Sequence, residues 1–204
     1  MRVLKPAGGA SRVLQRQRGG AAVEFAIVVV IFLTLVFGVI EFARAMYICN
    51  TLQEVTRRAA ALATSTDFSD SAAMQRVRER AIFRTSPGFL MFADPISDAN
   101  VKIDYLAITR SGADLATTPI PSGSLPASPA RNLQVCMSDP YDAGCIRLVR
   151  VRICVSGGTQ CDPVPYQTLV SLIRIPFSLP LSTTITNAET LGRPAGVAAA
   201  PCGC

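Results

Sequence analysis

The longest run of apolar positions lies near the N-terminus. Residues 25–40, FAIVVVIFLTLVFGVI, contain no charged side chain. Together with residues 20–24 they form a stretch of about 21 residues, enough for a helix to cross a hydrocarbon core about 30 Å thick. Val and Ile dominate this stretch, but lipid cannot satisfy the backbone hydrogen bonds of an open strand. The pattern therefore predicts a membrane-spanning helix.

Beyond residue 40 the apolar positions keep a helical period but become confined to one stripe. Their spacing alternates between four and three residues, and polar side chains such as Gln53, Glu54, Arg57 and Arg58 lie between them. We therefore expect one helix from Gly20 to about Thr64. Its first half faces lipid or neighbouring helices, and its second half packs on a folded domain through Ile48, Leu52, Val55, Ala59 and Leu62.

The rest of the chain alternates short elements with turn signals. A helix is expected at 70–85, capped by Asp70 or Ser71. Strands are expected at 100–109, 132–137, 147–155 and 181–188, whereas the four prolines of 117–132 favour a surface loop. The predicted fold class is α+β: a long N-terminal transmembrane helix packed on a small, pilin-like antiparallel sheet domain. The domains expected are a basic leader at 1–19, the helix at 20–64, a folded domain at 65–190 and a tail at 191–204.

In the strand expected at 147–155, side chains should alternate between two faces. Val149, Val151, Ile153 and Val155 would point one way, and Arg150, Arg152 and Cys154 the other.

The positive charge of the chain is concentrated before the apolar run. The formal net charge is +6, and residues 1–19 carry five basic side chains and no acidic one. A basic segment on one flank of a span is typical of the cytoplasmic side. We therefore expect a single-pass membrane protein with a cytoplasmic N-terminus and a C-terminal domain outside the cytoplasm. Nucleic acid is not an expected partner.

Most of the cysteines lie late in the chain, on the side expected to be outside the cytoplasm. Disulfides are favoured there, and none of the cysteines has the CxxC spacing of a zinc site. Two hairpin-closing bonds, Cys136–Cys145 and Cys154–Cys161, compete with a Cys136–Cys154 bond across strands. Cys49 is expected to be a buried helix residue. The disulfide candidates are Cys136, Cys145, Cys154, Cys161, Cys202 and Cys204.

Composition argues against catalysis. The chain has no histidine, so a Ser–His–Asp or Cys–His arrangement cannot be built. Asp139, Asp142 and Asp162 lie near the cysteine-rich part, but loop carboxylates are usually turn residues. We expect no enzyme activity, no metal site and no cofactor.

The basic leader and the apolar run allow three interpretations. The first is a secretory signal peptide cleaved after ARA at 43–45. The second is an uncleaved anchor with Glu24 at headgroup depth. The third is a pilin-type signal, cut on the cytoplasmic side between Gly19 and Gly20 with the helix left in place. The third accounts for the most residues, because it removes all the leader's basic residues and explains Glu24.

In this third interpretation Glu24 becomes the fifth residue of the mature chain. One helical turn separates it from the new amine of Gly20, and both groups are charged at neutral pH. An unpaired carboxylate in lipid costs on the order of 2–3 kcal/mol or more, which pairing with a neighbouring subunit's amine would partly recover. Glu24, with Phe25 beside it, is therefore expected to set the register between subunits.

Residues 18–63, RGGAAVEFAIVVVIFLTLVFGVIEFARAMYICNTLQEVTRRAAALA, resemble the TadE-like family, which are pseudopilin-like proteins of the tight-adherence (Flp, type IVb) pilus system. The resemblance rests on Gly19, the block AVEF at 22–25, Gly38, the block IEF at 40–42, Arg44 and the stretch 52–61. It implies cleavage after Gly19 by a prepilin peptidase, and it implies that the membrane is the bacterial inner membrane, with the C-terminal domain in the periplasm. It also implies a role in assembling or priming a Flp pilus.

The partners implied by the resemblance are the inner membrane, the prepilin peptidase, other pilins or pseudopilins, and the Flp pilus assembly platform. Incorporation into the pilus itself stays open. The alternative is an uncleaved, membrane-tethered periplasmic binding module of a secretion system.

Overall fold

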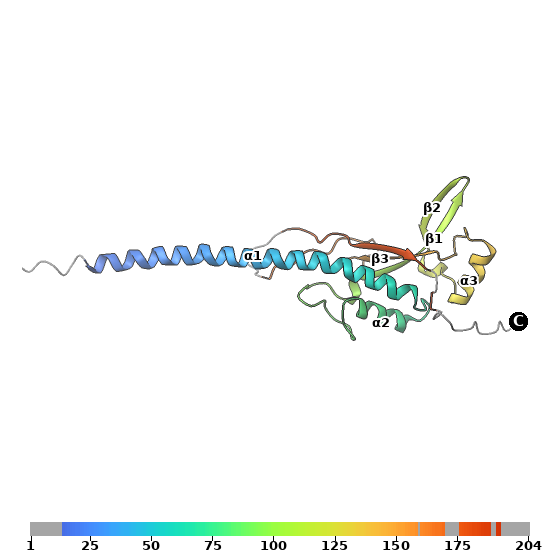
Figure 1. Ribbon diagram of the computed structural model, residues 1–204, viewed down its shortest axis with the longest axis horizontal. Coiled ribbons are helices and arrows are strands. Elements are labelled where there is room, and N and C mark those ends of the chain that lie inside the picture. Colours follow the sequence, from blue (N-terminus) through green and yellow to red (C-terminus); the bar gives the residue numbers. More distant parts are fainter. Residues whose placement is uncertain (1–13, 159, 170–175, 189–190, 193–204) are drawn as a thin grey trace, which may run out of the picture. The chain divides into compact units, whose positions relative to one another are not determined.

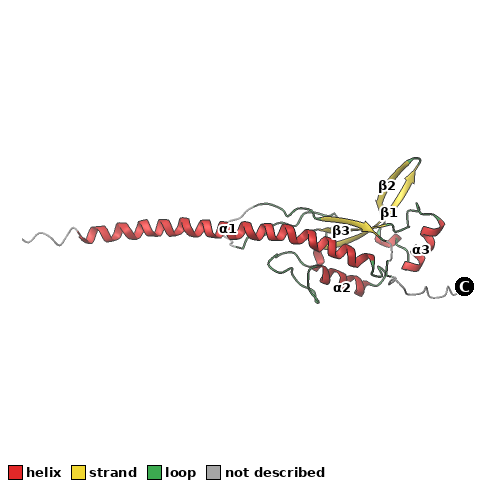
Figure 2. Ribbon diagram, viewed as in Figure 1, coloured by secondary structure: helices red, strands yellow, loops and turns green. Residues whose placement is uncertain are grey.

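The computed structural model of the protein describes residues 14–158, 160–169, 176–188 and 191–192, with the backbone alone for residues 14–19. The elements observed are a mixture of helices and antiparallel strands (Figures 1 and 2), which confirms the α+β class. They are α1 (Leu14–Thr64), α2 (Ser71–Ala81), η1 (Asp98–Asn100), β1 (Val101–Ser111), β2 (Asp114–Pro119), η2 (Ser122–Ser124), α3 (Pro129–Ser138), β3 (Leu148–Ile153) and β4 (Thr183–Asn187).

The chain divides into two compact units, Met1–Ala43 and Arg44–Cys204, and α1 contributes to both. No proline interrupts the sequence of α1, so each peptide can join its helical hydrogen-bond ladder. The described part of the first unit is helix alone. The second unit contains the remainder of α1 and all the other elements.

The sheet of the second unit is antiparallel, with the strand order β2-β1-β3-β4. Alternation along β3 buries Val149, Val151 and Ile153 on one face. The second part of α1 packs on this face, where Thr184 Oγ1 of β4 donates to Thr56 Oγ1 at 2.9 Å. The core of the unit is therefore the layer between α1 and the sheet.

Helix α2 covers the β1 side of the same face. Its N-cap Asp70 accepts hydrogen bonds from the backbone of Ala72 and Ala73, as the sequence pattern predicts. Tyr105 of β1 donates to Met74 Sδ of α2 at 3.6 Å. Burial raises the pKa of Tyr105 above its ordinary value, so the phenol keeps its proton and remains a donor.

The opposite face of the sheet carries a charged cluster. Asp104 lies opposite Arg150 in the register of β1 and β3. Its Oδ2 lies 3.1 Å from Arg150 Nη2 and 2.6 Å from Arg152 Nη2. The predicted alternation thus holds within β3. Beyond its end, Val155 is exposed and Cys154 is buried, because the chain turns away from the sheet.

The strand expected at 132–137 is wrong, because these residues belong to α3. Ser128 caps this helix by accepting a hydrogen bond from Arg131 N, and Pro129 occupies its first turn. A capping serine followed by proline is a helix-start signal that outweighs the strand preference of so short an apolar segment.

The surface loop expected at 117–132 is also partly wrong. Its first residues complete β2, its middle contains η2 and its end begins α3. β1 and β2 form a hairpin in which Ser111 pairs with Asp114, and Gly112 in the connection has a φ of 63°. Glycine adopts this left-handed conformation without strain, which permits the two-residue turn.

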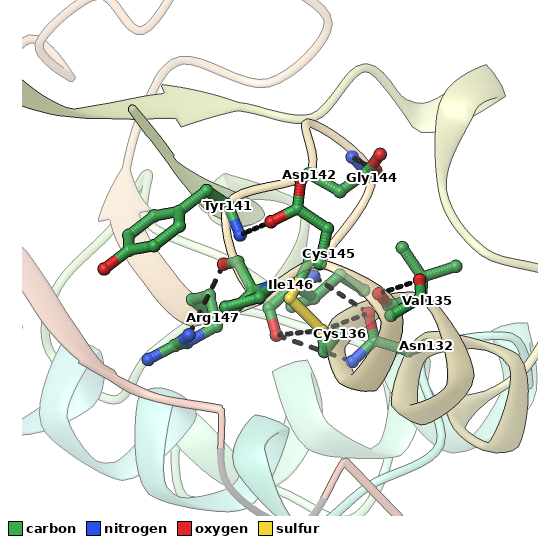
Figure 3. The surroundings of a disulfide bond; sticks show 12 residues. Asn132, Val135, Cys136, Tyr141, Asp142, Gly144, Cys145, Ile146 and Arg147 are labelled. Carbon is green, nitrogen blue, oxygen red and sulfur yellow. Dashed lines mark hydrogen bonds between the residues drawn. A yellow bond between two sulfur atoms is a disulfide. The ribbon is translucent and has the colours of Figure 1, made fainter. Parts of the chain in front are cut away.

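In the described part of the second unit there are two disulfides, Cys136–Cys145 and Cys154–Cys161. They correspond to the hairpin-closing alternative, and no Cys136–Cys154 bond forms. Around the first, Asn132 accepts from Ile146 N at 2.8 Å, which joins α3 to the chain entering β3 (Figure 3). Cys49 is free and half-buried rather than fully buried. Cys202 and Cys204 lie outside the described residues.

Candidate functional site

The residues expected to act in cleavage and subunit registry all lie within the N-terminal part of α1. Gly19 and Gly20 are helical, because α1 begins at Leu14 rather than at Gly20. A Cβ added to Gly20 would meet no atom within 4 Å. Glu24 is exposed one turn later, and Phe25 beside it is 71% exposed. Gly20 and the carboxylate of Glu24 are therefore both exposed to other molecules.

The surface around Glu24 is apolar on every side of the helix. Phe25, Val28, Val30 and Ile31, which the helical period distributes around the axis, are all more than half exposed. Among the described residues, one helix, α1, is long enough and apolar enough to cross a membrane. Its most apolar part has a mean hydropathy of 2.9, and none of that part is buried. A helix that is apolar all round needs lipid or other apolar helices to cover it.

Within this apolar surface Glu24 is chemically isolated. Between Gly20 and Ile40 the sequence has no other charged side chain. In the part of the chain that the structure describes, Glu24 has no hydrogen-bond or ion-pair partner. A carboxylate in such surroundings favours a cation from another molecule or the polar boundary of the membrane.

The helix-packing stripe lies in the second unit. Ile48, Leu52, Val55 and Ala59 are fully buried, and Leu62 is partly buried against the same core. Sequence reasoning missed Thr56, a buried polar residue of α1 that bonds to Ser182 and Thr184. The position of Thr56 next to Val55 of the buried stripe was the sequence feature that could have indicated its burial.

Sequence reasoning also missed the tertiary contacts of Arg44. Arg44 Nε donates to the carbonyl oxygen of Phe92 at 3.0 Å, and Nη2 donates to that of Asp94 at 3.3 Å. Nη1 donates to Gln167 O, and the guanidinium lies 5.4 Å from the ring centroid of Tyr166. One side chain thus joins α1 to two segments distant in sequence.

The acidic residues near the disulfides act in turns. Asp139 Oδ1 accepts from Tyr141 N at 2.8 Å, and Asp142 Oδ1 accepts from Gly144 N at 2.7 Å. Asp162 accepts a hydrogen bond from Val155 N through its backbone oxygen. Among the described residues, no group of three or more His, Cys, Asp or Glu side chains could hold a metal ion.

Comparison with known protein families gives a match to the first part of the chain. The family model described as TadE-like protein matches residues 19–61. Neither the curated proteins nor the solved structures contain a match. The matched range begins at Gly19, contains Glu24 and Arg44, and ends within the buried stripe. The glycine pair, the apolar span and the packing stripe thus form a TadE-like segment, and the family resemblance read from the sequence is confirmed over residues 19–61.

Proposed function

We propose that the protein is a single-pass, pseudopilin-like structural subunit that supports assembly or priming of a Flp pilus. The TadE-like segment links the chain to tight-adherence pilus systems. In this proposal the leader is removed at Gly19–Gly20 by a prepilin peptidase, and Glu24 pairs with the new amine of a neighbouring subunit. The second unit then lies in the periplasm. The role is structural rather than enzymatic.

The observation that carries the proposal is the carboxylate of Glu24, which has no partner among the described residues and lies in an exposed stretch of α1 with no other charged side chain between Gly20 and Ile40. A plain anchor needs only apolar residues, and an isolated acid weakens its insertion. The acid becomes favourable when a cation lies at the same depth. The amine created one turn before it, carried by each neighbouring copy, supplies such a cation and fixes the axial register.

The glycine pair supports the position of the cut. Each glycine in a helix interior is less stable than alanine by about 1 kcal/mol, so α1 unwinds most easily where two glycines are adjacent. A peptidase that needs an extended backbone would therefore open the helix at Gly19–Gly20 at the lowest free-energy cost.

The intact mass of the mature protein tests the cut. We expect a chain that begins at Gly20, measured by mass spectrometry of protein purified from its own membrane. Gly19→Val should leave the leader attached, whereas Gly38→Val, at another glycine of α1 with open space around it, should be cleaved normally. A wild-type chain that still begins at Met1 would favour the tethered binding module, and one that begins at Met46 would indicate a secreted protein.

The variant Glu24→Gln tests the registry role. It keeps the size of the side chain and removes its charge, so cleavage should persist while assembly falls by roughly ten-fold, the effect of losing a little over 1 kcal/mol of pairing. The measurement is surface pilus yield alongside the mass of the mature chain. Glu54→Gln, at an exposed position of α1 in the second unit, is the control and should assemble normally. Normal pilus yield in Glu24→Gln would remove the registry role.

A further inference from the structure

The loop that follows α2, residues 82–97, is held in one conformation by hydrogen bonds between its own residues. Leu90 N donates to Ile96 O at 2.7 Å, Ile96 N donates to Ala93 O at 2.9 Å, and Phe89 forms a bridge with Ser97. Leu90, Ala93 and Ile96 are buried in the core. These three side chains and the hydrogen bonds fix the conformation of the segment between them.

The same loop presents its largest apolar side chains outward. Phe89 is 55% exposed, Met91 is 67% exposed and Phe92 is 70% exposed. They lie within four consecutive residues, whereas the neighbouring Leu90, Ala93 and Ile96 are buried. Large apolar side chains clustered on a surface mark contacts with lipid or with another protein.

The loop is hydrogen-bonded to the part of α1 that directly follows its uncharged residues 25–40. Arg44 of α1 donates to the carbonyl oxygens of Phe92 and Asp94, and Tyr47 Oη donates to Met91 O at 3.4 Å. In Figure 1 this green loop lies beside α1, as these bonds require. Arg44 follows Ile40, the last residue of the uncharged run, by about one helical turn along the continuous helix.

The polar groups around the loop fit a membrane boundary. Arg84 is exposed and donates to Phe89 O at 3.4 Å, so a cation lies next to the apolar side chains, and the exposed Asp94 follows them. Tyr47 is itself 43% exposed. Tyrosine and arginine beside apolar side chains are typical of the layer where lipid headgroups meet acyl chains.

We propose that Phe89, Met91 and Phe92 insert into the periplasmic leaflet of the bilayer and hold the folded unit against the lipid surface. The occupant of this surface is lipid rather than a protein, because the loop is bonded to α1 within about two turns of the end of the membrane span. The proposal depends on α1 as a span and not on the role of the chain in a pilus.

The chain contains no tryptophan, so single tryptophans can report on depth without background. The experiment places Phe92→Trp or Phe89→Trp in the full-length chain, reconstituted in phosphatidylcholine vesicles with or without bromine on the acyl chains. We expect a blue-shifted emission and a loss of about half the intensity in brominated vesicles, since interfacial side chains lie roughly 5–10 Å deep. Leu115→Trp, at a 61% exposed position of β2, is the control and should not be quenched.

Phe37→Trp separates failure of this proposal from failure of the span. Quenching of Phe37→Trp without quenching of the loop variants would overturn loop insertion and leave the span intact. Absence of quenching in all of them would overturn both. A blue shift at Phe92→Trp without bromine quenching would show that protein covers the loop, and would also overturn the proposal.

Discussion

Replacing Leu52 by alanine is expected to lower the free energy of unfolding of the second unit by about 2–5 kcal/mol. Leu52 is fully buried in the stripe of α1 that packs on the sheet. Alanine at this position loses the apolar contacts of the leucine side chain. It also leaves a cavity between α1 and the sheet, which these two rigid elements cannot fill by moving together. The measurement is urea unfolding of the full chain in detergent, followed by near-ultraviolet circular dichroism of the tyrosines.

Leu33→Ala provides the matched control. Leu33 belongs to the same helix but is 43% exposed in the apolar stretch. Detergent covers leucine or alanine equally well at position 33. The unfolding midpoint of the second unit should therefore stay within error of wild type. Equal destabilisation by both variants would show that the stripe at Leu52 is not what joins α1 to the sheet.

Replacing Cys154 and Cys161 together by serine is expected to lower the free energy of unfolding by about 2–3 kcal/mol. The bond joins residues seven apart just after β3, and next to it Val155 N donates to Asp162 O at 3.0 Å. Without the covalent link the unfolded chain gains conformational freedom. In the folded state, the turn after β3 is then held only by noncovalent bonds such as the one between Val155 and Asp162. Urea unfolding again measures the change.

A reducing agent separates this effect from any effect of the serine side chains. Reduction should destabilise wild type at least as much as the double variant, since it opens Cys136–Cys145 as well. Cys49→Ser, which removes the cysteine that is free among the described residues, should retain the wild-type response to reduction. A wild-type chain whose unfolding midpoint does not change on reduction would contradict a stabilising role for the disulfides.

Local patterns were sufficient for most of the fold. The stripe from Ile48 to Leu62 and the alternation along β3 are periodicities that burial imposes directly, so α1 and the central strand follow from them. The hairpin of β1 and β2 was missed because β2 is exposed along its whole length and therefore has no buried face to produce alternation. Helix α3 was missed because its start signals were given less weight than a short apolar segment.

The candidate site divides in the same way. Gly19, Gly20 and Glu24 lie within six consecutive residues, so their relation is visible in a local motif. The bonds of Arg44 join residues 48 to 123 positions apart in sequence, and nothing in its neighbourhood along the chain indicates them. The exposure of Phe89, Met91 and Phe92 also could not be predicted from the sequence. Four consecutive apolar residues are expected to be buried unless the tertiary structure is known.

The bonds of Arg44 have a mechanical consequence. Arg44 is the first residue of the second unit, so a force transmitted along α1 would reach its guanidinium group before the buried stripe that begins at Ile48. That load would be shared between the carbonyl oxygens of Phe92 and Asp94 on one segment and that of Gln167 on another. Traction on the anchor would thus be spread over two loops before it reached the hydrophobic layer under the sheet.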